Sequence, residues 1–124
     1  YIFRFADILL LKAEALAQNG DVTSAMSLVN QVRSRVKLNA VTATSKDDAL
    51  TKILHERKLE LAFEGEYWFD LKRFGKAIEI LSKQKDGKGN LLPYTSNIST
   101  SKLIWPVPQS KIDANKNLVQ NPGY

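Results

Sequence analysis

Charged and large apolar side chains alternate through residues 56–73, which read Glu56-Arg57-Lys58-Leu59-Glu60-Leu61-Ala62-Phe63-Glu64-Gly65-Glu66-Tyr67-Trp68-Phe69-Asp70-Leu71-Lys72-Arg73. An unpaired ion that leaves water loses more free energy than packing returns, so charges this close to core-forming side chains should neutralise one another. The stretch therefore predicts a structural ion-pair network inside a helical body. Its expected members are Glu56, Arg57, Glu60, Glu64, Asp70 and Arg73.

The acids of this network are spaced for one helix face. Glu56, Glu60 and Glu64 repeat every fourth residue, and the helix that carries them is predicted to end at the glycine that follows Glu64. Like charges on one face repel, so cations such as Arg57 or Arg73 must approach from the same helix or the next one. The spacing thus requires helices that pack closely.

Two helices are predicted upstream, before residue 38. Apolar side chains cover more than one face of residues 4–19, so this helix should be largely buried. Gly20 can take the left-handed conformation that closes it, and Asp21 or Thr23 can cap the next helix, which runs to about Lys37. With so short a connection, the two helices should form a tight antiparallel pair.

The spacing of large and small side chains in this pair resembles one tetratricopeptide unit. The matching positions are Leu9, Ala13, Leu16, Gly20, Ala25, Val29 and Val32. Small residues at such positions let two helix backbones approach closely. A solenoid generally needs about three repeats to bury a continuous core, so a single pair must pack against something else.

Loop, capping and helix-breaking residues indicate the next elements of the chain. Polar residues predict a loop over 38–45, after which Ser45 or Asp47 can cap the third helix. Residues 67–81 predict either a fourth helix or a short helix pair broken at Gly75. Either form should fold back onto the third helix.

The last third of the chain is poor in periodic apolar patterns. Glycine, proline, serine and asparagine predict a long loop over residues 84–101. Prolines extend residues 103–108, and one short helix is predicted over residues 108–118. The expected fold is all-α: tetratricopeptide-like helix pairs packed as a bundle, with a long loop and an extended proline-rich C-terminal segment, in one domain over residues 1–124.

Composition excludes several classes of protein. A length of 124 residues with 44% hydrophobic content suits one globular domain, and the longest aliphatic run, residues 8–11, is far shorter than the roughly 20 residues that cross a bilayer. The net charge of +5 is spread as isolated lysines rather than gathered on one stripe, so we expect no nucleic-acid partner. The chain has no cysteine, which excludes disulfides and thiolate metal sites.

The residues that could form a catalytic or metal site fit an ordinary structural role better. Glu56, Glu60, Glu64 and His55, the only histidine, could suggest a carboxylate metal centre, but such a centre in a bundle needs two Glu-x-x-His pairs on facing helices and the sequence has none. No serine or cysteine arrangement that would identify a nucleophilic site accompanies His55. Glu64 and Asp70 could act as glycosidase carboxylates only across an open cleft, but their neighbours are core-forming. We expect no enzyme activity, metal or cofactor.

Three aromatic residues could stack on a sugar ring. Trp68 and Trp105 lie within apolar runs, so both are expected in the core. Tyr94 lies in the polar loop, where an exposed ring would be available to a ligand or partner. It is the only ligand-binding candidate that the sequence offers.

Four blocks of sequence, in order, resemble one family. They are Arg4-Phe5-Ala6-Asp7-Ile8-Leu9-Leu10 with Ala13-Glu14-Ala15; Asn30 with Val32-Arg33; Glu56-Arg57 through Asp70-Leu71 and Arg73; and Trp105-Pro106-Val107-Pro108 through Gln120-Asn121-Pro122-Gly123-Tyr124. The chain resembles the C-terminal part of SusD/RagB proteins, which are outer-membrane lipoproteins of the Bacteroidetes. Two residues depart from the family pattern: Tyr67 stands where arginine is usual and Lys111 where an acid is common.

The resemblance implies a non-catalytic, surface-exposed outer-membrane lipoprotein that captures glycans or other nutrients. It also implies a SusC-like TonB-dependent transporter as partner, and a membrane anchor through an N-terminal lipid. No start methionine, signal sequence or lipid-acceptor cysteine precedes the first helix, so we expect a piece of a longer protein. In the family this region is mainly scaffold and partner-facing, so no glycan-contacting residue is carried over.

A second hypothesis is a helical, tetratricopeptide-like protein-interaction module. A peptide-docking module should leave a concave, partly apolar face free, whereas a piece of a larger body should expose an apolar patch where the rest of that body packs. The two hypotheses therefore differ in the surface that the helices present.

Overall fold

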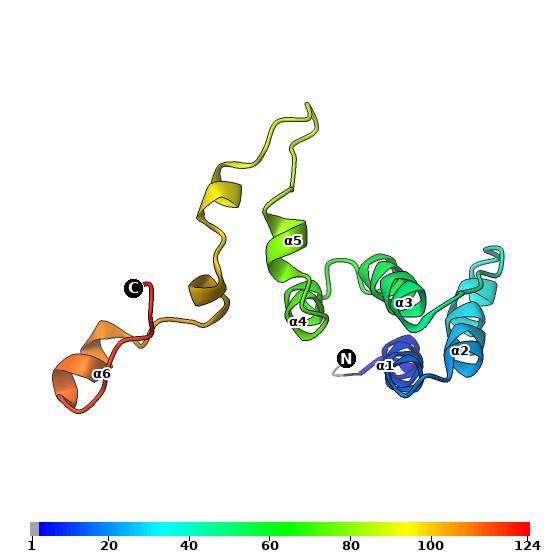
Figure 1. Cartoon of the computed structure of the whole chain (residues 1–124), viewed down its shortest axis with the longest axis horizontal. Coiled ribbons are helices and arrows are strands. Elements are labelled where there is room, and N and C mark those ends of the chain that lie inside the picture. Colours follow the sequence, from blue (N-terminus) through cyan, green and yellow to red (C-terminus); the bar gives the residue numbers. More distant parts are fainter. Residues whose placement is uncertain (1–2) are drawn as a thin grey trace. The chain divides into compact units, whose positions relative to one another are not determined.

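The computed structural model describes residues 3–124, and within this range it is all-α, as the sequence predicts (Figure 1). The helices are α1 (Phe5–Gln18), α2 (Val22–Arg35), α3 (Lys46–Glu60), α4 (Tyr67–Arg73), α5 (Ala77–Leu81) and α6 (Gln109–Ala114), with the 3₁₀ helices η1 (Pro93–Asn97) and η2 (Thr100–Leu103). The described residues contain no strand, only an isolated antiparallel bridge between Lys85 and Leu91.

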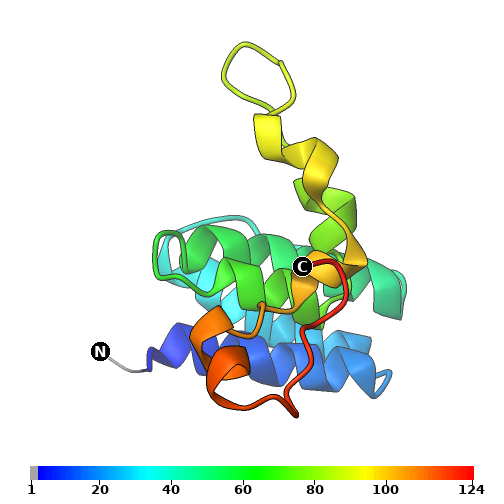
Figure 2. The ribbon, with the colours of Figure 1, turned by 90° about the vertical axis from the view of Figure 1, so that its left-hand side faces the viewer.

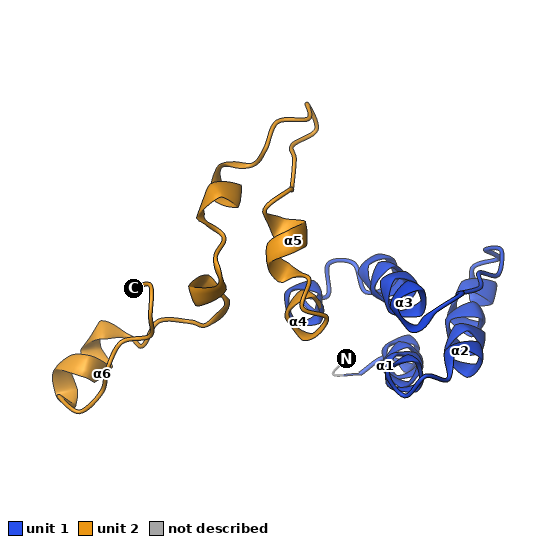
Figure 3. Cartoon of the chain, viewed as in Figure 1, with its two compact units in different colours: residues 1–70 blue, residues 71–124 orange. Residues whose placement is uncertain are grey.

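The chain divides into two compact units, residues 1–70 and residues 71–124 (Figure 3). Unit 1 contains α1, α2, α3 and the first half of α4, and unit 2 contains everything that follows. One domain over residues 1–124 stays a prediction.

In unit 1, α1 contacts both α2 and α3 (Figures 1 and 2). The start of α1 is tied to the end of α3 by Arg4 and Glu60, and the end of α1 to the start of α3 by Lys46 Nζ, which donates to Gln18 O at 2.9 Å. The helix α3 is therefore antiparallel to α1. Their shared core with α2 is formed by Leu10, Ala13, Ala17, Ala25, Met26, Val29, Val32, Ala49, Ile53 and Leu54.

The turns at the helix ends resolve the alternatives that the sequence left open. Gly20 adopts φ +88 after α1, and Asp21 caps α2 by accepting a hydrogen bond from Ser24 N at 3.0 Å. Ser45 caps α3 by accepting from Asp48 N at 3.2 Å. Each cap satisfies an amide that the first turn of a helix leaves without an intrahelical partner.

The Asp21 cap makes the stability of unit 1 depend on pH. The hydrogen bonds from Ser24 lower the pKa of Asp21 below its ordinary value, because they favour the ionised carboxylate. The contribution of the cap is therefore complete above the unfolded-state pKa and is lost as pH falls through the lower, folded-state pKa. We expect the stability difference between wild type and Asp21→Asn, which retains a capping side chain, to change between about pH 5 and pH 2 in chemical unfolding. A constant difference over this range would contradict the prediction.

A crossover segment, residues 36–45, joins the parallel helices α2 and α3, and polar side chains hold it in place. Asn30 donates to Val41 O and accepts from Val41 N, both at 2.9 Å. Arg33 Nε donates to Asn39 O at 2.9 Å, and Lys52 Nζ donates to Thr42 O at 2.6 Å. Side chains thus supply the hydrogen bonds that this extended backbone would otherwise find in a sheet.

The helix α3 ends earlier than predicted, at Glu60 rather than Glu64. The chain turns over the next residues, where Phe63 adopts φ +66 and Gly65 φ +86. A residue in the left-handed region cannot continue a right-handed helix, and the turn buries Leu61. Glu64 therefore leaves the helix face that the sequence assigned to it.

In unit 2, the short helix pair is the alternative that forms. Gly75 adopts φ +66 between the end of α4 and α5, and Leu71 and Ala77 are buried on either side of the break. The predicted loop over residues 84–101 contains η1, part of η2 and the bridge between Lys85 and Leu91. The last predicted helix is shorter than expected, because the backbone is extended at Asn115, directly after α6.

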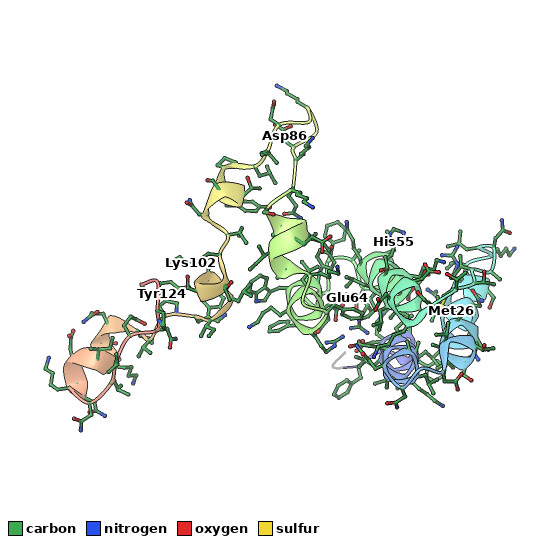
Figure 4. All side chains as sticks on the ribbon, viewed as in Figure 1. Met26, His55, Glu64, Asp86, Lys102 and Tyr124 are labelled. Carbon is green, nitrogen blue, oxygen red and sulfur yellow. The ribbon has the colours of Figure 1, made fainter. Side chains whose placement is uncertain are left out.

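Side chains of the C-terminal tail hold the proline-rich segment. The amide of Gln120 donates to Val107 O at 2.9 Å and accepts from Val107 N at 2.8 Å, and Asn121 Nδ2 donates to Trp105 O at 2.6 Å. Figure 4 shows Lys102 beside Tyr124, with Nζ 3.8 Å from the ring centroid. Because the prolines lack an amide proton, this segment cannot form the regular hydrogen bonds of a strand. Side chains of the tail bond to its remaining backbone groups instead.

The prediction that Trp105 lies in the core is wrong, since its exposed fraction is 79%. The segment is held through its backbone by the tail, so the hydrogen bonding does not require burial of the ring. Trp68, the other tryptophan assigned to the core, is partly buried.

Candidate functional site

The most buried charges of unit 1 meet at Arg57, on α3. Its Nε donates to Asp70 Oδ2 at 2.8 Å, and its Nη1 donates to Asp7 Oδ1 at 2.7 Å. The exposed side-chain fractions are 2% for Arg57 and 1% for Asp70. Pairing at this depth offsets the desolvation of both ions, and it connects the first turn of α1, the last turns of α3 and the start of α4.

A second group of ions surrounds Glu60, the last residue of α3. Arg4 donates to Glu60 Oε1 at 2.7 Å and to Glu60 O at 3.0 Å. From α2, Arg35 donates to both carboxylate oxygens at 2.9 and 2.8 Å. Arg4 also lies 3.3 Å from Glu64. One carboxylate thus joins the start of α1, the end of α2 and the end of α3.

A third ion pair closes the seam between α2 and α3. Arg33 Nη1 donates to Glu56 Oε2 at 2.7 Å, and the same guanidinium holds Asn39 through its Nε. Glu56 is buried, and its partner is largely shielded from solvent. We name these three groups together, Arg57 with Asp7 and Asp70, Glu60 with Arg4, Arg35 and Glu64, and Arg33 with Glu56, the ion-pair cluster.

The structure gathers most of the residues that the sequence assigned to a network. Glu56, Arg57, Glu60, Glu64 and Asp70 all take part in the ion-pair cluster, although Glu64 reaches it from the turn after α3 rather than from the helix. Arg73 lies at the end of α4 in unit 2, where its guanidinium carbon is 5.6 Å from the centroid of the Phe74 ring. That the network serves only to hold the structure stays a proposal.

Sequence reasoning missed the partners that come from α1 and α2. Arg33 and Arg35, both on α2, donate to acids of α3. Arg4 and Asp7 stand one turn apart at the start of α1 and each contacts an ion of opposite charge on α3. The available signal was charge balance, because a helix with closely spaced acids needs cations from its neighbours.

The two acids considered for hydrolysis do not face each other within the cluster. Asp70 is buried and bonded to Arg57, whereas Glu64 is exposed and faces Arg4, so the two acids considered for hydrolysis belong to different ion groups. Within residues 3–124, no three side chains of a metal-binding type come together. His55 is an exposed residue of α3.

Tyr94, the ligand-binding candidate, lies on η1 in unit 2. Its ring is partly exposed, and its hydroxyl donates to Gln84 Oε1. The hydrogen bond restrains the orientation of the ring.

The helices define an all-α fold that begins with a tetratricopeptide-like helix pair. A family model for the SusD family matches residues 1–124, so the chain belongs to this family. It is 37% identical to a SusD-like protein of Formosa agariphila and 32% identical to the starch-binding protein SusD of Bacteroides thetaiotaomicron, in each case over 99% of this chain. A solved SusD superfamily protein of Bacteroides vulgatus matches 98% of this chain and 27% of its own, with a TM-score of 0.83 and 28% identity.

The chain spans about a quarter of the length of the curated relatives it matches, namely 24% of the Formosa protein and 21% of the Bacteroides thetaiotaomicron protein. No helix among residues 3–124 has both the length and the apolar character that a membrane crossing requires.

Proposed function

We propose that this chain is the helical scaffold of a glycan- or nutrient-binding protein of the SusD type. The observation that carries the proposal is the match of all 124 residues to the SusD family, together with a relative named for starch binding. The whole protein would sit at the outer membrane, anchored by a lipid, and would pass oligosaccharide to a SusC-like TonB-dependent transporter. It would be exposed at the cell surface.

The ion-pair cluster supports a scaffold role for this segment. Its acids are bonded to arginines of neighbouring helices, and the most buried ones are removed from solvent. A carboxylate that is buried against a guanidinium cannot reach a substrate without breaking that pair. We therefore propose that the protein is not an enzyme and that glycan contacts fall mainly outside this segment.

The alternative of a peptide-docking module is less well supported. The helix pair α1 and α2 is packed against α3, which contacts both helices and so occupies one of their faces. A docking repeat would need that face open and its neighbours repeated. The apolar side chains exposed on α1 lie on the opposite side of the helix from its buried residues.

The test compares glycan binding by two forms of the protein. The protein as encoded should bind oligosaccharides in isothermal titration calorimetry and release no cleavage products on chromatography, whereas the 124-residue chain should show little or no affinity. Tyr94→Ala in the encoded protein tests whether this exposed ring contributes, with Arg35→Ala, a surface change in unit 1, as the matched control. Strong binding by the 124-residue chain would contradict the scaffold role, and cleavage would contradict the absence of catalysis.

A further inference from the structure

A hairpin in unit 2 carries three exposed lysines, Lys83, Lys85 and Lys88, within six residues. The chain leaves α5, turns and comes back to η1, and the antiparallel bridge between Lys85 and Leu91 joins the two arms (Figure 1). We call residues 83–92 the basic hairpin. The fold thus places together lysines that stand as isolated residues in the sequence.

The single acid of the basic hairpin is bonded to the backbone of its own turn. Asp86 Oδ1 accepts from Lys88 N at 2.8 Å and from Asn90 N at 2.9 Å, at the position that Figure 4 labels. The carboxylate therefore serves the turn rather than a lysine side chain. Within residues 3–124, Lys85 and Lys88 have no ion-pair partner.

One carboxylate of α5 attracts the third lysine, but another cation already holds it. The pKa of Glu79 is lowered by its hydrogen bond with Lys76, whose Nζ donates at 2.7 Å, and to a lesser extent by the charge of Lys83. Two ammonium groups thus share one carboxylate. The base of the basic hairpin therefore keeps a positive charge as well.

Unpaired lysines of this kind stay at the surface of a folded protein. An ammonium group that leaves water without a partner loses more free energy than packing returns, and lysine is almost never fully buried unless it is paired. The basic hairpin therefore either remains in solvent or meets an anionic partner. Its charge, unlike an apolar surface, does not favour burial against more of the same polypeptide.

An aromatic ring is attached to the basic hairpin. The hydroxyl of Tyr94 donates to Gln84 Oε1, and Gln84 stands between Lys83 and Lys85 in the sequence. The ring is 44% exposed. An exposed aromatic face packs against the apolar face of a sugar ring, while ammonium groups pair with carboxylate or sulfate substituents. A negatively charged sugar offers both kinds of contact.

We propose that the basic hairpin contacts an anionic glycan, one that carries carboxylate or sulfate groups, through Lys85 and Lys88, with Tyr94 as a platform for a sugar ring. The inference rests on the proposed function, because the family match is the reason to expect a glycan, and the basic hairpin adds the charge of that glycan. Contacts between exposed ions are weak and are screened by salt. The basic hairpin therefore supplements glycan contacts made elsewhere in the encoded protein and does not bind glycan on its own.

Isothermal titration calorimetry on the protein as encoded tests the inference with matched probes. Oligomers of alginate and polygalacturonate supply carboxylates and oligomers of carrageenan supply sulfates, each beside its neutral methyl-esterified or desulfated counterpart. Lys85→Gln with Lys88→Gln should weaken binding of the charged oligomers about fivefold, the effect of two exposed ion pairs, and leave the neutral counterparts unchanged. The carboxylate and sulfate sets together show which anion the lysines pair with.

Two variants control for net charge and for side-chain chemistry. Lys111→Gln with Lys116→Gln removes the same charge from two exposed lysines in and after α6, and it should leave binding unchanged. Lys85→Arg with Lys88→Arg keeps both cations on the basic hairpin and should retain affinity. Added sodium chloride should weaken binding of the charged oligomers by the wild-type protein and leave binding of the neutral ones unchanged.

Four outcomes would overturn the inference. Equal losses in the basic-hairpin and control variants would mean that net charge acts without a site, and binding to neutral glycans alone would exclude an anionic ligand while leaving the proposed function intact. Binding to phosphatidylglycerol vesicles that the Lys85→Gln, Lys88→Gln variant loses, with unchanged glycan affinity, would identify a membrane surface as the partner. Absence of binding to every oligomer would contradict the proposed function as well.

Discussion

Replacing Arg57 with alanine is expected to lower the free energy of unfolding by about 3 kcal/mol, because it leaves a buried carboxylate without its cation. Arg57 donates to Asp70 and Asp7, and both Arg57 and Asp70 are almost completely buried. The loss would appear as a lower urea midpoint with an unchanged slope in unfolding followed by circular dichroism. A change of less than about 0.5 kcal/mol would mean that the guanidinium does not compensate a buried charge.

Arg35→Ala is the matched control for this prediction. Arg35 also donates to an acid of α3, but its side chain is 60% exposed, so water can replace it. Exposed ion pairs contribute little to stability, and we expect a change within about 1 kcal/mol. In the double variant with Arg57→Ala and Asp70→Ala, the loss should be smaller than the sum of the two single losses, since removing both partners leaves fewer unpaired ions.

Replacing Ile53 with alanine is expected to cost about 3 kcal/mol of unfolding free energy. Ile53 lies on α3, is completely buried and belongs to the core that α3 shares with α1 and α2. The loss combines the transfer of apolar surface with the cavity that the neighbouring helices cannot close. Chemical unfolding of both proteins in parallel measures it.

The control for the core is Leu59→Ala, on the same helix. Leu59 is a similar aliphatic residue, but it is 55% exposed, so its truncation should cost less than about 1 kcal/mol. Equal effects of the two substitutions would contradict the placement of Ile53 in the core. The comparison holds helix propensity nearly constant, because both positions are in α3 and both become alanine.

Local chemistry made the first part of the fold predictable. Gly20 and Asp21 encode the turn between α1 and α2 through a left-handed glycine and a capping carboxylate, and both features appear as expected. Gly75 separates α4 from α5, which was one of the two alternatives that the sequence allowed. Signals of this kind depend on a few adjacent residues, so a single sequence contains them.

Features that depend on distant residues were not predictable in the same way. The end of α3 falls before Phe63, a residue type that gives no sign of a left-handed conformation. Trp105 is exposed although it lies in an apolar run, and the tail that holds its backbone through Asn121 meets it only in the folded chain. The arginines at α1 and α2 pair with acids of α3 because the packing of the helices brings them together. The sequence of any single helix does not determine that packing.

The wide sequence separation of the ion pairs bears on the order in which the chain folds. Arg4 and Glu60 are 56 residues apart, and Arg57 and Asp7 are 50 apart, whereas α1 and α2 are joined by only three residues. Closing a long loop costs entropy before its contacts return any free energy, so the first helix hairpin can form early and the distant pairs can form only late. Contacts that form after the rate-limiting step mainly slow unfolding. The bonds between the start of α1 and the end of α3 would then act as a latch that prolongs the lifetime of the native state.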